Sequence, residues 1–213
     1  MATDYPLVGA PSITLSQFQA VLTAAHSPAA GEAPAMYAAI RRYNVDPAVV
    51  LAIMQHESGF GKAGIAVGRN NGFGSRYYSG TTSFGATNRG GWAAFPNWAS
   101  GAAYTASLLA SSTYAGNKGA NTARTFPKVY APSSDGNNPT AYGLAVVNAI
   151  NSWKGLPSVK AGTTKSPVTT AKAKASATVA KAAPAVTAHG PSMLTIAGVG
   201  LLLILMVFLA MRL

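Results

Sequence analysis

The stretch Asp46-Pro47-Ala48-Val49-Val50-Leu51-Ala52-Ile53-Met54-Gln55-His56-Glu57-Ser58-Gly59-Phe60-Gly61 is an apolar run that ends at a carboxylate and two glycines. Asp46 is a favourable helix N-cap, and Pro47 suits the first helical position. The apolar residues that follow are typical of a buried helix, and glycine commonly ends one. The stretch therefore predicts a core helix with an acid in its last turn.

Glu57 is one of only two glutamates in the chain. A negative charge at this position faces the negative end of the helix dipole and an apolar wall, and both disfavour ionisation. A carboxyl that stays protonated near neutral pH can act as a general acid, as glycoside cleavage requires. The alternative is a solvated surface glutamate, which is the commoner situation in a last helical turn.

The residues around Glu57 resemble the catalytic motif of the lysozyme-like superfamily, especially the autolysin-type and flagellar-type glucosaminidases. In that motif glutamate, serine or threonine, glycine and an aromatic follow a buried helix. Three later segments match in the same order and extend the resemblance over residues 45–153. They are the Asn-x-Phe-Gly segment at Asn71-Gly72-Phe73-Gly74, the aromatic turn Phe95-Pro96-Asn97-Trp98-Ala99-Ser100-Gly101, and a closing segment that contains Tyr130 and Tyr142.

The resemblance implies a peptidoglycan glycosidase with Glu57 as general acid. It assigns Tyr130 to the catalytic site, where it would hold the reacting sugar, and Tyr142 can take that role instead or bind substrate. Asn71 would hydrogen-bond an N-acetyl group, and Phe73 would lie beneath a sugar ring. Groove-lining or core positions remain open for the tyrosines, and a structural turn for Asn71 and Phe73.

No second carboxylate matches a catalytic position of the family. Asp46 is better explained as an N-cap, and Glu32 as a charge in or beside the first turn of a helix. Asp4 and Asp135 also match no catalytic position. This shortage favours a mechanism with one carboxylate, in which the N-acetyl group assists or the 6-hydroxyl of the sugar attacks, as in lytic transglycosylases. Hydrolysis and transglycosylation both stay open.

The fold class is expected to be α+β and predominantly α, with a lysozyme-like domain and a small irregular β-hairpin lobe. Besides the core helix, helices are expected over residues 15–25, 34–42, 102–109 and 143–150. Between residues 61 and 92 the chain is rich in Gly, Ser, Thr and Asn. Short strands at 76–78 and 81–84 would form the hairpin there, as one wall of the glycan groove.

Three regions follow one another along the 213 residues. Residues 1–155 have the composition of a globular domain. Residues 156–191 are rich in Ala, Thr, Lys, Val, Pro and Ser without an aromatic or acidic residue, which predicts a disordered linker. Residues 192–213 are almost entirely uncharged and mostly apolar, which predicts a transmembrane anchor.

The anchor raises a question of topology. The first sixteen residues lack the features of a signal peptide, and lysines before the anchor favour a cytoplasmic domain, whereas peptidoglycan lies outside the membrane. A hypothesis that removes the conflict is a virion protein of a membrane-containing phage, delivered to the wall at entry. The alternative is a protein of the bacterial membrane with a cytoplasmic domain.

Charge and residue types limit the remaining function classes. Sixteen Lys and Arg against five Asp and Glu give a net charge of +11, which favours anionic partners such as cell-wall polymers. Nucleic-acid binding is not favoured, because the lysine-rich linker has no interleaved aromatics. No cysteine is present, and no cofactor or metal site is expected. His56 is expected to face another side of the helix than Glu57, and Ser58 has no base partner.

The expected partners are therefore peptidoglycan glycan strands, a lipid bilayer through the C-terminal helix, and virion membrane or capsid proteins. A hypothesis from another class is a glycan-binding or structural membrane protein of a virion that has the lysozyme-like shape without turnover.

Overall fold

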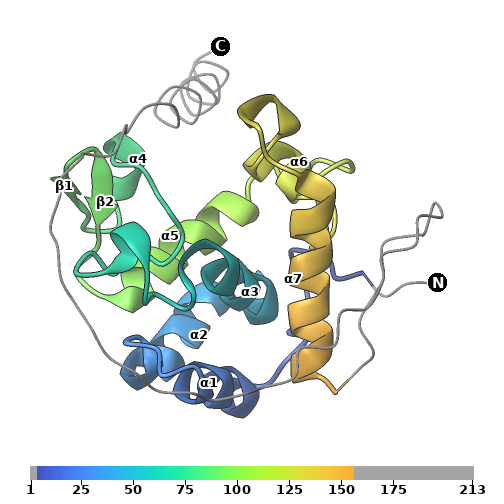
Figure 1. The fold of residues 1–213 in the computed structure, drawn as a ribbon, viewed down its shortest axis with the longest axis horizontal. Helices are drawn as coiled ribbons and strands as arrows, with labels where there is room; N and C mark the ends of the chain where they lie inside the picture. The colour runs from blue at the N-terminus through green and yellow to red at the C-terminus, as the bar shows by residue number, and fades with distance from the viewer. Residues whose placement is uncertain (1–3, 156–213) are drawn as a thin grey trace, which may run out of the picture.

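The computed structural model describes residues 4–155 as a mainly helical domain with one two-stranded sheet. Its central element is helix α3 (Pro47–Ser58), with α7 (Pro139–Trp153) along one side and the small sheet on the other (Figure 1). The remaining helices are α1 (Leu15–Ala24), α2 (Ala33–Arg41), α4 (Ser79–Thr82), α5 (Trp98–Leu109) and α6 (Pro127–Tyr130), with 3₁₀ turns η1 (Ala30–Glu32), η2 (Gly64–Ala66) and η3 (Ser133–Asp135). This architecture confirms the α+β, predominantly α class.

Helix α3 is a core helix because nearly all of its side chains are apolar. Every residue from Pro47 to Met54 is buried. Asp46 caps the first turn by accepting a hydrogen bond from Ala48 N at 3.0 Å. At the other end Gly59 adopts a left-handed conformation with φ 55°, which glycine tolerates without strain. The predicted core helix and both of its ends are confirmed.

The other long helices also begin at polar caps that are visible in the sequence. Thr14 and Gln17 form a reciprocal capping box at α1, and Asn97 and Asn138 cap α5 and α7. The four helices predicted outside the core stretch all exist, with ends shifted by up to four residues. Helix α7 begins earlier than predicted, because Asn138 and Pro139 provide its cap and first residue.

The hairpin lies further along the chain than predicted. Strands β1 (Thr87–Arg89) and β2 (Trp92–Ala94) pair antiparallel around Gly90 and Gly91, whose φ angles are 66° and 80°. Two glycines with positive φ suit the tight turn of a two-residue hairpin. The predicted strands at 76–78 and 81–84 are wrong, because residues 79–82 form the short helix α4. Arg76 pairs with Trp92 through an isolated bridge outside the two strands, and its guanidinium lies over the Trp92 ring.

The predicted linker (156–191) and anchor (192–213) lie outside the described residues. Within residues 4–155, no helix combines the length and apolar character needed to cross a bilayer.

Candidate active site

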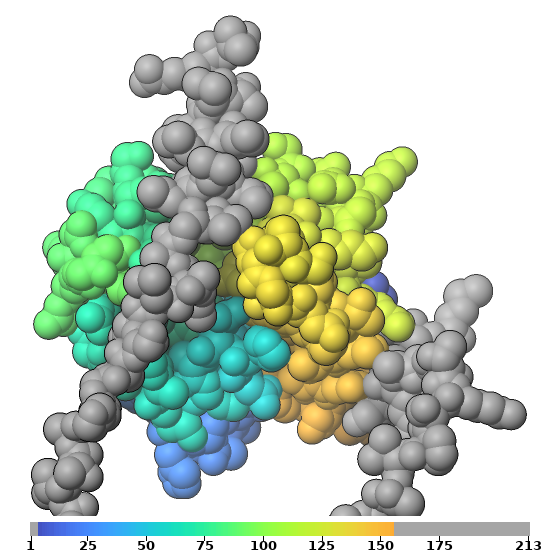
Figure 2. All heavy atoms as spheres, turned by 45° about the horizontal axis from the view of Figure 1, so that its top comes forward, coloured from blue at the N-terminus to red at the C-terminus, as the bar shows by residue number. Residues whose placement is uncertain are grey.

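Glu57 lies in the last turn of α3, beside the loop that follows residue 70. Its side chain is open to solvent, although protein atoms surround the carboxyl on its other sides. Gly74 passes close by, since a Cβ added there would come within 3.5 Å of Glu57 Oε2. The sheet lobe (green) and residues 130–153 (yellow and orange) lie on opposite sides of the domain in the view of Figure 2.

A tyrosine from α7 binds the Glu57 carboxyl directly. The Tyr142 hydroxyl donates a hydrogen bond to Glu57 Oε1 at 2.6 Å. The Tyr142 ring is 6 % exposed. Phe126 and Tyr130 meet it edge to face, at centroid distances of 5.6 Å and 6.2 Å. The phenol is therefore held in place by packing, and its hydroxyl orients the carboxyl.

Burial raises the pKa of Glu57 above its ordinary value of 4.5, while the Tyr142 hydrogen bond and the nearby His56 charge act in the opposite direction. The desolvation effect is the largest of the three, so the site favours the protonated carboxyl. Burial also raises the pKa of Tyr142 well above its ordinary value. Tyr142 is therefore a neutral hydrogen-bond donor, and Glu57 can be a proton donor.

Tyr130 lies next to Tyr142, but its hydroxyl is engaged elsewhere. It donates a hydrogen bond to the backbone oxygen of Phe73 at 2.9 Å. This bond joins α6 to the loop beside Glu57. The structure thus brings Tyr130, Tyr142 and Glu57 together, with Tyr142 as the tyrosine in contact with the acid.

Asn71 and Phe73 are both buried in the same loop. The Asn71 amide nitrogen donates to the backbone oxygens of Ser75 and Ala93, each at 2.8 Å, and its oxygen accepts from Ser75 N at 2.9 Å. The Phe73 ring lies in the core and is 1 % exposed. In this arrangement neither side chain faces the solvent, so both stabilise the loop, and substrate contact by them stays a prediction.

Ser58 fixes the loop from the helix side. Its buried hydroxyl donates to the Gly72 carbonyl oxygen at 2.8 Å, lies 3.0 Å from the Met54 carbonyl oxygen and accepts from Gly61 N at 2.9 Å. The serine of the motif therefore acts as a connector between α3 and the loop that carries Gly74.

The other four acids of the chain are all within the described residues, and three of them bind backbone amides. Asp46 caps α3 at the end opposite Glu57 and also accepts from Ser12 N. Glu32 accepts from Ala99 N, and Asp4 accepts from Tyr5 N and Arg124 N. Asp135 is exposed in η3. None of these carboxylates contacts Glu57, and the residues described here contain no acid, His or Cys cluster suited to a metal.

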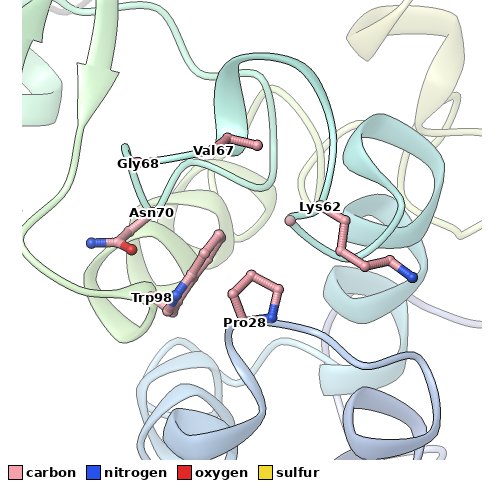
Figure 3. Close-up of a pocket in the computed structure, with 7 residues that line it drawn as sticks. Pro28, Lys62, Val67, Gly68, Asn70 and Trp98 are labelled. Carbon is pink, nitrogen blue, oxygen red and sulfur yellow. The ribbon is translucent and has the colours of Figure 1, made fainter.

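Two hollows lie near α3, and neither contains Glu57. A pocket of about 350 Å³ is lined by Pro28, Gly61, Lys62, Val67, Gly68, Asn70 and Trp98 (Figure 3). The Lys62 amine points out of this pocket and donates to the Ala25 oxygen at 2.7 Å, so the pocket presents mainly apolar surface. Glu57 itself is exposed to solvent, as access by a polymer requires.

Sequence reasoning missed a contact of His56. Its ring stacks on Tyr142, with centroids 3.9 Å apart and planes at 28°. The position of His56 on α3 gives no signal for this contact, because it depends on where α7 crosses.

A family model described as mannosyl-glycoprotein endo-beta-N-acetylglucosaminidase matches residues 33–154. No curated protein and no solved structure matches the chain. The matched range begins at α2 and ends after α7, so it includes Glu57, the loop beside it and both tyrosines.

Proposed function

Because the chain belongs to the glucosaminidase family of peptidoglycan-cleaving glycosidases, we propose that it cleaves the β-1,4 glycan with Glu57 as the general acid. The observation that carries this proposal is the desolvated Glu57 carboxyl bound by the Tyr142 hydroxyl at 2.6 Å. A raised pKa favours the protonated carboxyl, which is the form that can give a proton to a glycosidic oxygen.

The proposed reaction uses one carboxylate. Glu57 gives its proton to the leaving oxygen as the bond from this oxygen to C1 breaks. The positive charge that develops at C1 is met by the substrate itself, either by the oxygen of the N-acetyl group or by the 6-hydroxyl. Three of the other acids are bound to backbone amides away from Glu57, which supports this assignment. Glu57, as a carboxylate, then accepts a proton from water or from the 6-hydroxyl.

A peptidoglycan zymogram with Glu57→Gln tests the role of the acid. Gln keeps the shape and can accept from Tyr142, but it has no proton to donate. We expect clearing by the wild type and a loss of at least about 100-fold in the variant. Gln55→Ala is a matched control, since Gln55 is exposed in the same turn of α3. Equal clearing by Glu57→Gln would remove Glu57 from this role.

Mass analysis of the released muropeptides separates the two forms of the reaction. Reducing ends mean that water completes the cleavage, and 1,6-anhydro ends mean that the 6-hydroxyl does. The competing function, glycan binding without turnover, predicts that the wild type leaves the zymogram intact yet sediments with purified walls.

Delivery to the wall is a separate proposal that rests on the sequence. The apolar residues 192–213 would anchor the enzyme in the membrane of a phage particle, with residues 156–191 as tether. Purified particles should then contain the protein in their lipid fraction. Recovery only from the bacterial membrane would support the bacterial alternative.

A further inference from the structure

His56 is the exposed member of the group of side chains around Glu57. It lies in the last turn of α3 with its ring stacked on Tyr142 at 3.9 Å. Phe126 and Tyr130 contact Tyr142 edge to face from within the core. The imidazole is therefore a solvent-exposed part of the Tyr142 environment.

We propose that His56 is a positioning residue that holds the Tyr142 hydroxyl against Glu57 and couples its own charge to the charge of the Glu57 carboxyl. The proposal rests on the function proposed for Glu57. It goes further by naming a residue that regulates the acid without touching the substrate.

The mechanical part of the proposal follows from the stacking geometry. Rings at 3.9 Å with an angle of 28° are in face contact. With His56 stacked on one face and Phe126 and Tyr130 in edge-to-face contact, the phenol has little freedom to rotate away. The hydroxyl stays within 2.6 Å of Glu57 Oε1, which keeps the carboxyl in one orientation.

The electrostatic part follows from proximity. Protonated His56 places a positive charge beside Glu57 and over the face of Tyr142, where a cation interacts favourably with the ring. The charge favours the Glu57 carboxylate, and it also polarises the phenol toward donation. Charged His56 therefore opposes the burial that keeps Glu57 protonated.

A charge on His56 therefore works against the protonated Glu57 carboxyl, which is the form that contains the general acid. The titratable groups that face the pair are Tyr142 from α7 and, behind it, Tyr130 from α6, and both stay neutral because burial raises the pKa of each well above its ordinary value.

Three substitutions of His56 separate the effect of its ring from the effect of its charge. His56→Phe keeps the stacking and removes the charge, His56→Lys keeps a charge and removes the ring, and His56→Gln removes both. His56 is exposed, so these changes should leave the fold intact. Gln55→Ala, in the same turn, serves as the control for a general change at the end of α3.

The chain itself makes the measurement simple, because Glu32 and Glu57 are its only glutamates. Labelling the full chain with carboxyl-¹³C glutamate gives two NMR signals, and Glu57→Gln assigns them. We expect the Glu57 titration midpoint to move up by about half a pH unit in His56→Phe and His56→Gln, and to move down or stay in His56→Lys. The Glu32 signal and the Gln55→Ala protein should titrate as in the wild type.

Kinetics provide the second readout. The alkaline limit of kcat/KM should follow the Glu57 midpoint in each variant, and kcat at acid pH should fall in His56→Gln but not in His56→Phe. Identical Glu57 midpoints in the wild type, His56→Phe and His56→Lys would overturn the coupling, and equal kcat in His56→Gln and His56→Phe would overturn the positioning. Glu57→Gln could stay active while the Glu57 midpoint still shifts in the His56 variants. In that case the function proposed for Glu57 fails and the coupling stands.

Discussion

At the scale of single residues, the site depends on how Glu57 is surrounded. Burial favours its protonated form, and the hydrogen bond from Tyr142 and the charge of His56 favour the ionised form. The balance leaves the pKa raised, so one carboxyl can work as an acid. Because each of these contributions comes from a different side chain, each can be changed separately.

Tyr142→Phe should move the alkaline limit of activity to higher pH. The substitution removes a hydrogen bond that stabilises the carboxylate, so the pKa of Glu57 rises further and the acid stays protonated over a wider range. The orientation of the carboxyl is also lost, and we expect kcat at acid pH to fall about tenfold. The pH profiles of kcat and kcat/KM measure these two effects. An alkaline limit that moves to lower pH would contradict the expected rise in the pKa of Glu57.

Glu57→Gln should make the fold more stable at neutral pH. A carboxyl whose pKa is raised on folding binds its proton more tightly in the folded chain, so its ionisation lowers the free energy of unfolding as pH rises above 4.5. Gln cannot ionise and avoids that loss. Thermal denaturation should show a higher Tm for the variant at pH 7 and similar Tm values at pH well below 4.5. A lower Tm for the variant at pH 7 would contradict the expected loss of stability from ionisation of Glu57.

At the scale of helices and strands, the acids other than Glu57 have structural partners. The Glu32 carboxylate lies at the end of η1, where α2 begins, and accepts from Ala99 N in the first turn of α5. The N-termini of two helices thus meet at one negative charge, which is favourable for both dipoles. The sequence predicts Glu32 beside the first turn of one helix. The packing of α2 on α5 also brings it to the first turn of a second helix.

Glu32→Ala should lower the free energy of unfolding by about 1 kcal/mol, because the Ala99 amide loses its partner at the start of α5. Asp135→Ala is the matched control, since Asp135 is exposed and its carboxylate accepts a hydrogen bond from its neighbour Ser134. Urea denaturation of both variants measures the difference. Equal effects would mean that the Glu32 contact contributes nothing.

Gly143→Ala should destabilise α7 although alanine is the better helix former. A Cβ at this position would overlap the backbone of Arg124, whose carbonyl carbon would lie 2.8 Å away, so α7 would have to move. We expect a loss of about 1–3 kcal/mol in the free energy of unfolding, together with lower activity, since α7 carries Tyr142. Gly31→Ala, with open space around it, is the control and should be close to neutral.

At the scale of the whole molecule, charge is distributed unevenly. The sequence from Ser58 to Ser134 contains no acid and seven basic residues, namely Lys62, Arg69, Arg76, Arg89, Lys118, Arg124 and Lys128. This part of the chain includes the sheet lobe on one side of Glu57. A positive domain attracts an anionic polymer before any specific contact forms.

Binding to purified cell walls should therefore weaken as salt increases. The inactive Glu57→Gln protein allows binding to be measured without cleavage. Co-sedimentation should fall several-fold between about 0.05 M and 0.5 M salt, because screening shortens the range of the attraction. Walls from which the anionic polymers were extracted should show a smaller effect. Salt-independent binding would mean that the net charge plays no part.

The local features of the fold follow from the order of residues in the chain. The caps at Asp46 and Thr14, the apolar run of α3 and its glycine end are all decided by neighbours in the chain, so helix boundaries and the place of Glu57 could be predicted. The Gly90-Gly91 turn is equally local, and as a pair of glycines it indicates the true hairpin better than the polar segment around residues 76–84 does.

The side chains that surround Glu57 come together through the packing of distant helices. Tyr142 is 85 residues from Glu57, and the hydrogen bond between them exists because α7 crosses α3 at its C-terminal end. The same packing puts His56 on Tyr142 and the Tyr130 hydroxyl on the Phe73 carbonyl, while Asn71 and Phe73 become buried. Helix formation depends on near neighbours, whereas burial and the resulting pKa of Glu57 depend on residues that only folding brings together.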